Sequence, residues 1–230
     1  MKVAVISDIH SNLDALRAVI ASLPPYDSLL CLGDIVGYGP EPNDVIEELR
    51  ILEPKVTIMG NHDYAVTTGD VRGFSPDAAQ AVEWTRGQMK QENLQWLSTL
   101  ASTSRAEMNG KLVGMFHGSP RDPLSEYVLP GISQSYLREL VQSANADVVL
   151  LGHTHIPMVY SFNKRLLANP GSVGQPRDSD PRASFAILTL SKSEVAFDVK
   201  RAEYDVDSAA SKIRNVGLPR FLADRLHAGM

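Results

Sequence analysis

Cysteine is nearly absent from this chain, which has one, Cys31, among its 230 residues. A single thiol cannot form an intramolecular disulfide, so the class of small disulfide-stapled secreted domains is excluded. Cys31 lies inside the apolar run at residues 29–32, and we interpret it as a buried core thiol rather than a reactive one. Low cysteine content suits a reducing compartment, so we predict a cytoplasmic protein.

Long apolar runs are also missing. No stretch approaches the roughly 20 apolar residues that a helix needs to cross a bilayer. The first apolar run, at residues 3–6, is too short for the hydrophobic part of a signal peptide, and polar Ser7 and Asp8 follow it directly. We therefore expect no membrane association.

Basic residues are outnumbered by acidic ones, 22 against 27, which gives a formal net charge of −5. A negatively charged surface disfavours nucleic acid and anionic membrane as partners. It also counts against a nuclease function. It is compatible with a small phosphate-ester substrate, because bound metal ions can outweigh the global field locally. Nothing in the composition bears on the oligomeric state.

Short β-branched apolar segments alternate with helical patterns in the first 60 residues. Strands are expected at residues 3–6, 28–32 and 56–59, and helices at residues 12–22 and 42–52. Asn12 stands where a helix N-cap is needed. This alternation favours a parallel sheet with right-handed crossovers.

The remainder of the chain does not continue this alternation of strands and helices. Helical patterns at residues 76–89 and 93–100 predict a helical insertion, around residues 64–102, over one end of the sheet. Beyond it, the Asn109-Gly110 pair predicts a hairpin, and alternation at residues 184–190 and 195–200 predicts antiparallel strands. The layout fits two packed sheets with helices outside, in a single domain over residues 1–230.

Five short polar clusters, rich in histidine and glycine, each follow a predicted strand. They are Asp8-Ile9-His10, Gly33-Asp34, Gly60-Asn61-His62-Asp63, His117-Gly118 and Gly152-His153-Thr154-His155. In α/β sheets, ligand sites form at the carboxyl ends of the strands. One such cluster alone is a weak signal, but five in order are specific, and we expect them to converge on one rim.

The spacing within the clusters suggests shared ligands. In extended backbone, residues i and i+2 point to the same side, so Asp8 and His10 would reach one ion. By the same rule His153 and His155 would face one cavity, and Asp34 adds a carboxylate that can bridge two ions. The seven predicted metal ligands are Asp8, His10, Asp34, Asn61, His117, His153 and His155.

This ligand set predicts the cofactor. Seven ligands are too many for one tetrahedral site and suit two ions that share a bridge. Mixed nitrogen and oxygen donors suit manganese, with iron, zinc, cobalt or nickel as alternatives, over magnesium or calcium, which prefer oxygen alone. We therefore predict two divalent transition-metal ions.

Taken in order, the five clusters resemble the signature of the calcineurin-like phosphoesterases, most closely their small single-domain bacterial and archaeal branch. The resemblance runs over residues 2–182. It implies an α/β fold, a four-layer sandwich of two mixed β-sheets flanked by helices. It also implies a metallophosphoesterase that hydrolyses phosphodiesters or phosphomonoesters with water activated by a dinuclear metal centre.

The resemblance further divides the ligands and assigns one catalytic residue. It implies one ion held by Asp8, His10, Asp34 and His155, and a second held by Asp34, Asn61, His117 and His153. His62 would then face the substrate phosphate, where it stabilises the transition state or protonates the leaving oxygen. The alternative places His62 behind the ligands as a supporting residue. Asp63 is expected to orient the loop.

The sequence departs from the family pattern after Gly33-Asp34. Family members that dephosphorylate proteins continue this motif as Gly-Asp-x-x-Asp-Arg, whereas here Gly37-Tyr38-Gly39-Pro40 follows. The pairing of the catalytic histidine with that second aspartate therefore loses support. Tyr38 either lines the pocket or packs within the turn. Arg177 and Arg182 either contact phosphate or remain solvated surface charges.

A second class of function keeps the fold without the reaction. In this alternative the chain is a metal-binding scaffold or protein-interaction module with little or no catalysis. The presence of His62 and of all seven ligands favours the enzyme.

Overall fold

The computed structural model describes residues 1–192 and 194–230, and its described strands form two five-stranded sheets. The strands are β1 (Lys2–Ile6), β2 (Ser28–Cys31), β3 (Val56–Thr57), β4 (Thr103–Met108), β5 (Lys111–Phe116), β6 (Val148–Leu150), β7 (Met158–Phe162), β8 (Arg165–Asn169), β9 (Ala183–Leu190) and β10 (Val195–Ala202). One sheet has the order β10-β9-β1-β2-β3, and the other has the order β4-β5-β6-β8-β7.

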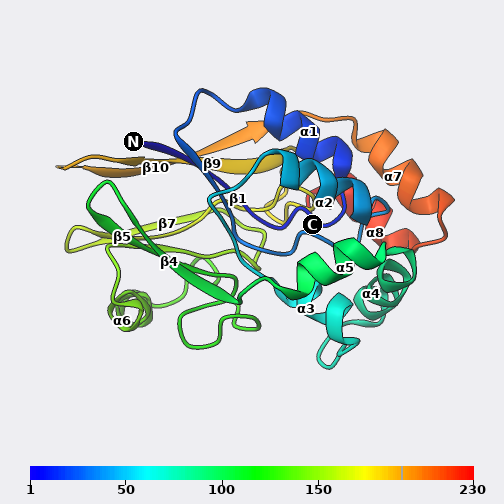
Figure 1. Cartoon of the computed structure of the whole chain (residues 1–230), viewed down its shortest axis with the longest axis horizontal. Helices are drawn as coiled ribbons and strands as arrows, with labels where there is room; N and C mark the ends of the chain where they lie inside the picture. Colours follow the sequence, from blue (N-terminus) through cyan, green and yellow to red (C-terminus); the bar gives the residue numbers. More distant parts are fainter. Residues whose placement is uncertain (193) are drawn as a thin grey trace.

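Helices cover the outer faces of both sheets. They are α1 (Leu13–Ser22), α2 (Pro42–Ile51), α3 (Asn61–Thr68), α4 (Pro76–Gln88), α5 (Gln91–Ser98), α6 (Gln134–Ala144), α7 (Val206–Asn215) and α8 (Arg220–Ala228). In Figure 1, α1 and α2 lie over the first sheet and α6 lies against the second, while the other helices gather at one end. The predicted four-layer α/β sandwich is confirmed. No described helix is long and apolar enough to cross a membrane.

The core is built from strands that are buried on both faces. Val3 and Val5 of β1 pack between the two sheets, whereas Ala4 and Ile6 pack under the helices. Successive side chains of a strand point to opposite faces, so one short apolar run serves two layers of core. This explains why the strands read as continuous apolar segments rather than alternating ones.

Both sheets are mixed, and their parallel strands end at the same edge. In the first sheet β1, β2 and β3 run parallel, and β9 runs antiparallel to β1 and β10. In the second sheet β5, β6 and β8 run parallel, with β4 and β7 as antiparallel edge strands. The hairpin predicted at residues 109–110 is present, and the antiparallel strands predicted at residues 184–190 and 195–200 pair as β9 and β10. The polar clusters therefore emerge from neighbouring strand ends.

Two helices were not predicted. α3 begins at Asn61 directly after Gly60, and its buried apolar residues are few, chiefly Ala65 and Val66, so no long apolar stripe marks it in the sequence. The second of these helices, α8, lies near the end of the chain. It buries Leu222 and Leu226 on one face. The predicted helices at residues 76–89 and 93–100 are present as α4 and α5.

Candidate metal centre

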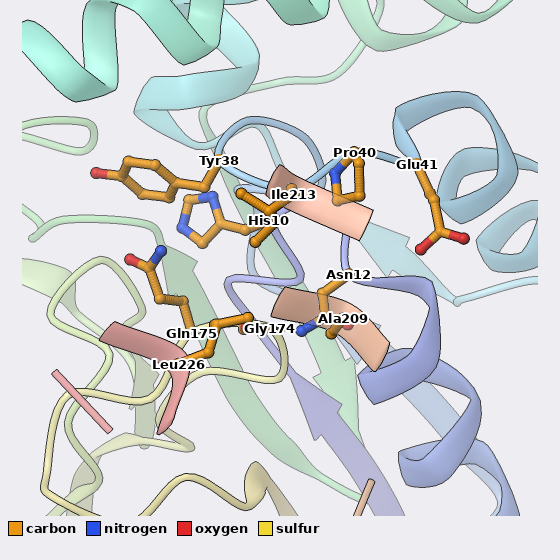
Figure 2. Close-up of a pocket in the computed structure, with 11 residues that line it drawn as sticks. His10, Asn12, Tyr38, Pro40, Glu41, Gly174, Gln175, Ala209, Ile213 and Leu226 are labelled. Atoms are coloured by element: carbon orange, nitrogen blue, oxygen red, sulfur yellow. Dashed lines mark hydrogen bonds between the residues drawn. The ribbon is translucent and has the colours of Figure 1, made fainter. Parts of the chain in front are cut away.

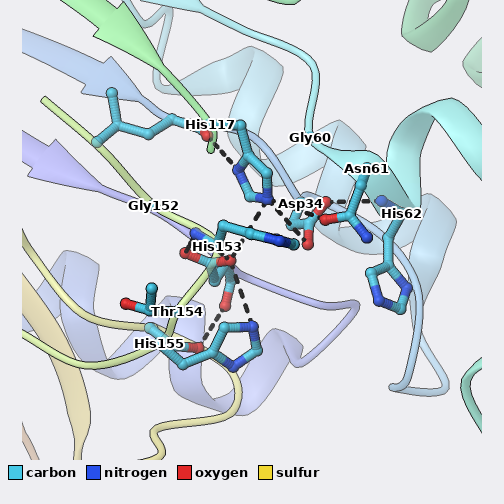
Figure 3. Close-up of polar contacts among 12 residues, drawn as sticks. Asp34, Gly60, Asn61, His62, His117, Gly152, His153, Thr154 and His155 are labelled. Atoms are coloured by element: carbon cyan, nitrogen blue, oxygen red, sulfur yellow. Dashed lines mark hydrogen bonds and ion pairs between the residues drawn. The ribbon is translucent and has the colours of Figure 1, made fainter. Parts of the chain in front are cut away.

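The five polar clusters meet where β1, β2, β3, β5 and β6 end. Figure 3 shows Asp34, His117 and His153, from three of these clusters, pointing toward one another. The backbone there is not extended, so the reasoning from alternating side chains was wrong. The φ angles of Asp8, His10, Asp34, His153 and His155 are all positive, between 50° and 67°. The chain turns sharply out of each strand because backbone bonds to the next strand's loop hold it: Asp8 N–H donates to Gly33 O, and His10 N–H donates to Asp34 O, both at 3.0 Å.

Glycine is needed where these loops touch. A Cβ atom on Gly60 would lie 2.1 Å from Oδ1 of Asp34. Gly33 has a φ of 90°, and a Cβ there would lie 2.5 Å from the backbone nitrogen of Gly60. No larger residue fits at either position, so the two glycines let the second and third clusters approach each other.

The first group of candidate ligands consists of Asp8, His10, Asp34 and His155, which offer one ligand atom each, all within 4.8 Å of one another. All four residues are buried. Nε2 of His10 lies 3.0 Å from Nε2 of His155. Asp8 Oδ1 lies 3.3 Å from the His155 nitrogen, and Asp34 Oδ2 lies 3.5 Å from the His10 nitrogen.

The hydrogen bonds of the two rings show which nitrogen atoms are available to bind an ion. Nδ1 of His10 donates to the carbonyl of Val36 at 3.2 Å, and Nδ1 of His155 donates to the carbonyl of Gln175 at 2.5 Å. Each neutral ring therefore carries its proton on Nδ1, and the two Nε2 lone pairs face each other beside two carboxylates. A cation satisfies all four acceptors, so the donor set fits a divalent metal ion.

The second group consists of Asp34, His117 and His153, whose ligand atoms also lie within 4.8 Å of one another. Nε2 of His117 lies 3.2 Å from Asp34 Oδ2 and 3.2 Å from Asn61 Oδ1, while its Nδ1 donates to the carbonyl of Leu32 at 2.8 Å. Asp34 thus turns the same oxygen toward both groups. That position suits a carboxylate bridge between two ions.

The orientation of His153 completes this group. Its Nε2 donates to the carbonyl of Ser125 at 3.3 Å, which leaves Nδ1 as the nitrogen available to an ion. The backbone N–H of His153 lies 3.2 Å from both carboxylate oxygens of Asp8, so the two groups are also tied through the backbone. All seven predicted ligands are therefore brought to one place.

Crowding of carboxylates and imidazoles shifts the pKa values strongly. Burial alone would lower the pKa of His117, but the charges of Asp34 and Asp8 raise it to about 10. Burial raises the pKa of Asp8 to about 7, against the effect of His117. Burial holds the pKa values of His10 and His155 well below the usual range. The metal-free centre thus keeps a proton on His117 at neutral pH.

His62 lies beside the ligands without an acidic partner among the described residues. Its backbone N–H donates to Asp34 Oδ1 at 2.8 Å, and its ring packs on Tyr38, Phe74 and His10 with centroid distances of 4.3, 4.8 and 4.8 Å. Its Nδ1 is buried and has no hydrogen-bond partner. Burial lowers the pKa of His62 to about 4, although the Asp34 charge opposes this, so the ring is neutral at neutral pH.

Asp63 holds the loop that presents His62, as predicted. Its Oδ1 accepts hydrogen bonds from the backbone of Ile35 at 2.9 Å and Val36 at 3.1 Å, and its Oδ2 accepts one from Gly60 at 3.0 Å. One carboxylate therefore joins the loop after β2 to the N-terminus of α3.

An open pocket of about 400 Å³ adjoins the centre, and its lining includes His62, His153, Phe74, Tyr127 and Arg177. On the other side of His10, a cavity of only about 10 Å³ lies under Ile213 and Leu226 of α7 and α8 (Figure 2). That volume holds about one water molecule. Of these two hollows beside the centre, the pocket of about 400 Å³ is therefore the one that can receive a substrate.

Two contributions to the site were not predicted. The ring of Tyr127 stacks on His153 at a centroid distance of 3.9 Å, and no pattern in its loop marks it. Gln175 positions His155 through a backbone carbonyl, which any residue could supply, so sequence carries no signal for it. The Asn169-Pro170-Gly171-Ser172 segment also supports the site: Asn169 Nδ2 donates to Gly152 O at 2.6 Å, and Ser172 Oγ donates to Asp8 O at 2.7 Å.

Comparison with known proteins shows the family to which the chain belongs. Residues 1–193 match the family model described as the calcineurin-like phosphoesterase superfamily domain. The chain belongs to this superfamily. The resemblance inferred from the ordered polar clusters is thereby confirmed.

Individual proteins are similar to this chain over all or part of its length. Uncharacterized protein MJ0912 of Methanocaldococcus jannaschii is 37% identical over 246 residues, which cover 99% of this chain and 98% of that protein. The crystal structure of a metallophosphoesterase from Sphaerobacter thermophilus superimposes with a TM-score of 0.86 at 34% identity and covers 100% of this chain and 99% of that one. A symmetrical bis(5'-nucleosyl)-tetraphosphatase of Yersinia enterocolitica is 35% identical over 105 residues, only 38% of this chain and 36% of that protein.

Proposed function

We propose that this protein is a dinuclear metal-dependent phosphoesterase that hydrolyses small phosphodiesters or phosphomonoesters with water. The observation that carries the proposal is the meeting of two buried ligand groups at Asp34, with unprotonated imidazole nitrogens facing each other. Membership in a phosphoesterase superfamily supports phosphate-ester hydrolysis in general. The pocket beside the centre offers the room for a substrate.

The proposed ligands divide between two ions around the shared carboxylate. One ion takes Asp8, His10, Asp34 and His155, and the other takes Asp34, Asn61, His117 and His153. Manganese is our first candidate, with iron, zinc, cobalt or nickel as alternatives, because the donors mix nitrogen with oxygen. Divalent ions at such a centre polarise a phosphate oxygen and lower the pKa of water.

His62 is the proposed catalytic residue of the chain itself. It lines the pocket next to Asn61, and its ring is neutral in the free protein because burial lowers its pKa to about 4. A neutral imidazole donates one N–H hydrogen bond, so we assign His62 to stabilising charge on a phosphate oxygen. To act as an acid toward the leaving oxygen, His62 would first need the substrate's negative charge to raise its pKa.

The pocket narrows the substrate class. Phe74 and Tyr127 give it aromatic walls, and its volume of about 400 Å³ leaves room for an organic group on the phosphate. The partial likeness to a bis(5'-nucleosyl)-tetraphosphatase is consistent with a nucleotide-like ester. That likeness spans little more than a third of this chain, so we extend the proposal to small phosphate esters as a class.

The experiment that tests the proposal compares two esters. Metal-stripped protein, refilled with Mn²⁺ to two ions per chain, is given bis-p-nitrophenyl phosphate and p-nitrophenyl phosphate side by side. Faster turnover of the diester would identify a phosphodiesterase, and the reverse preference would identify a phosphatase. Absence of turnover with both, with the ions bound, would contradict the proposal and favour the metal-binding scaffold.

A further inference from the structure

Arg177 is a half-buried arginine in the wall of the large pocket, on the same lining as His62 and His153. Its Nη2 donates to the hydroxyl of Tyr38 at 3.3 Å and to Oε1 of Gln175 at 3.2 Å. Its Nε is buried and has no hydrogen-bond partner. Throughout residues 1–192 and 194–230, no carboxylate lies within ion-pair distance of this guanidinium.

Neighbouring arginines differ from Arg177 in this respect. Arg72 lines the same pocket but forms a bidentate pair with Asp70, and its side chain is 90% exposed. Arg182, five residues along the same loop, forms a bidentate pair with Asp180. Both therefore have a local counter-charge, whereas Arg177 does not. A guanidinium that is half removed from water and lacks an anion is costly unless an anion binds there.

The position of Arg177 is fixed by what surrounds it. Its backbone N–H donates to the carbonyl of the candidate ligand His155 at 3.2 Å. Its guanidinium carbon lies 5.8 Å from the ring centre of Tyr38, and that ring packs on His62 at 4.3 Å. The same charge contributes to lowering the pKa of His62, after burial and against Asp34. The cation therefore lies in the pocket wall that also carries His62 and His153.

We propose that Arg177 is a substrate-binding residue whose guanidinium holds a non-bridging oxygen of the substrate phosphate beside the metal centre. This inference rests on the proposed function and names the group that captures the anion. Arginine suits the role because its planar fork stays charged and forms short, charge-assisted hydrogen bonds to phosphate oxygens. Tyr38 and Gln175 hold its Nη2 in place.

The test measures binding separately from turnover. Inorganic phosphate is titrated by calorimetry into Mn²⁺-loaded wild-type protein and into Arg177→Met, which keeps the apolar stem, and Arg177→Lys, which keeps the charge. Arg182→Gln, in the same loop, is the matched control. We expect the Kd for phosphate to rise at least about tenfold in Arg177→Met, with partial recovery in Arg177→Lys and no change in Arg182→Gln.

Metal content and the thermal midpoint are measured in every variant, so that loss of the centre is not mistaken for loss of an anion site. Tyr38→Phe removes the hydroxyl that Arg177 contacts. We expect it to change phosphate affinity by less than about threefold, because a bound phosphate remains the main partner of the guanidinium.

Three outcomes would overturn the proposal: no phosphate binding by the wild type, unchanged affinity in fully metallated Arg177→Met, or an equal loss in Tyr38→Phe. Failure of the proposed function is a separate result. If the wild type binds phosphate through Arg177 but hydrolyses neither nitrophenyl ester, the anion site stands and the hydrolase does not.

Discussion

Asp34 belongs to both groups of candidate ligands in the described part of the chain. Its Oδ2 lies 3.2 Å from His117 Nε2 and 3.5 Å from His10 Nε2, while its Oδ1 accepts the backbone N–H of His62. One carboxylate therefore joins both groups of candidate ligands to the loop that presents His62, the proposed catalytic residue.

The Asp34→Asn substitution is expected to weaken both ions together, by at least about tenfold each, because the amide removes the charge that they share. The measurement is metal content after dialysis against a series of Mn²⁺ concentrations. Loss of a single ion with the other retained would contradict the bridging position.

His62 contributes differently, since it binds no ion in the proposed arrangement. His62→Ala is expected to keep both ions and to lower kcat by about a hundredfold or more, as the substrate loses one hydrogen-bond donor in a buried site. Metal analysis and steady-state kinetics on the same preparation check this. Wild-type turnover in His62→Ala would remove the residue from the mechanism.

The proton on His117 makes metal binding depend on pH. Its pKa is about 10, above the usual value, and the neutral ring is the form that binds an ion. At pH 8.5, which lies above the pKa of about 7 for Asp8 and below the pKa of His117, metal binding should release close to one proton, from His117. Metal affinity should rise as the pH approaches 10. Calorimetry in two buffers with different ionisation enthalpies measures the proton, and heat independent of buffer would contradict the assignment.

At the scale of elements, the N-terminus of α3 joins the loop after β2, which carries Asp34, to the segment that carries Asn61 and His62. Gly60 caps this helix, and Asp63 in its first turn accepts the three backbone hydrogen bonds from Ile35, Val36 and Gly60. The helix is short and has few buried apolar residues, so this carboxylate supplies much of what holds it in place.

Asp63→Ala leaves three buried N–H groups without an acceptor and is expected to lower the free energy of unfolding by about 2–4 kcal/mol. The control is Asp70→Ala, which removes a surface ion pair with Arg72 and should lower the free energy of unfolding far less. Urea unfolding of the metal-free proteins measures both. Equal effects of the two substitutions would show that the loop does not depend on Asp63.

Strands were easier to predict than the helices that complete the site. Segments such as β1 and β2 are short, apolar and bounded by polar residues, and each lies at the predicted place. Helix α3 escaped prediction because its stability comes from Asp63 and from tertiary contacts rather than from an apolar stripe. The positive φ angles at the candidate ligands were not predicted either, because hydrogen bonds between loops impose them.

At the scale of the whole molecule, we propose that residues 1–230 form one domain, with the helices between residues 64 and 102 as an insertion. Trp96 packs against the core that lies under α1 and α2, and Trp84 packs against the cluster that includes α7 and α8. Both tryptophans lie in the insertion, on α4 and α5. Because both tryptophans pack against core clusters, the insertion should unfold together with the remainder of the domain.

Unfolding in urea, followed by tryptophan fluorescence and by far-ultraviolet circular dichroism, tests this proposal. Fluorescence reports the insertion and dichroism reports the entire chain, so one domain should give coincident midpoints. A fluorescence transition at clearly lower urea would show that the insertion is a separate unit.

The amino-acid sequence by itself determined which groups are available for chemistry and in what order they follow the strands. Residue types set the donor atoms, and the apolar runs that precede them set the sheet edge where they emerge. Tertiary structure decided the rest, because it depends on how segments far apart in the chain pack. Only the packing of the two sheets brings His10 within 3.0 Å of His155. It also leaves His62 without an acidic partner among the residues that the structure describes, and it turns Arg177, but not Arg182, into the pocket.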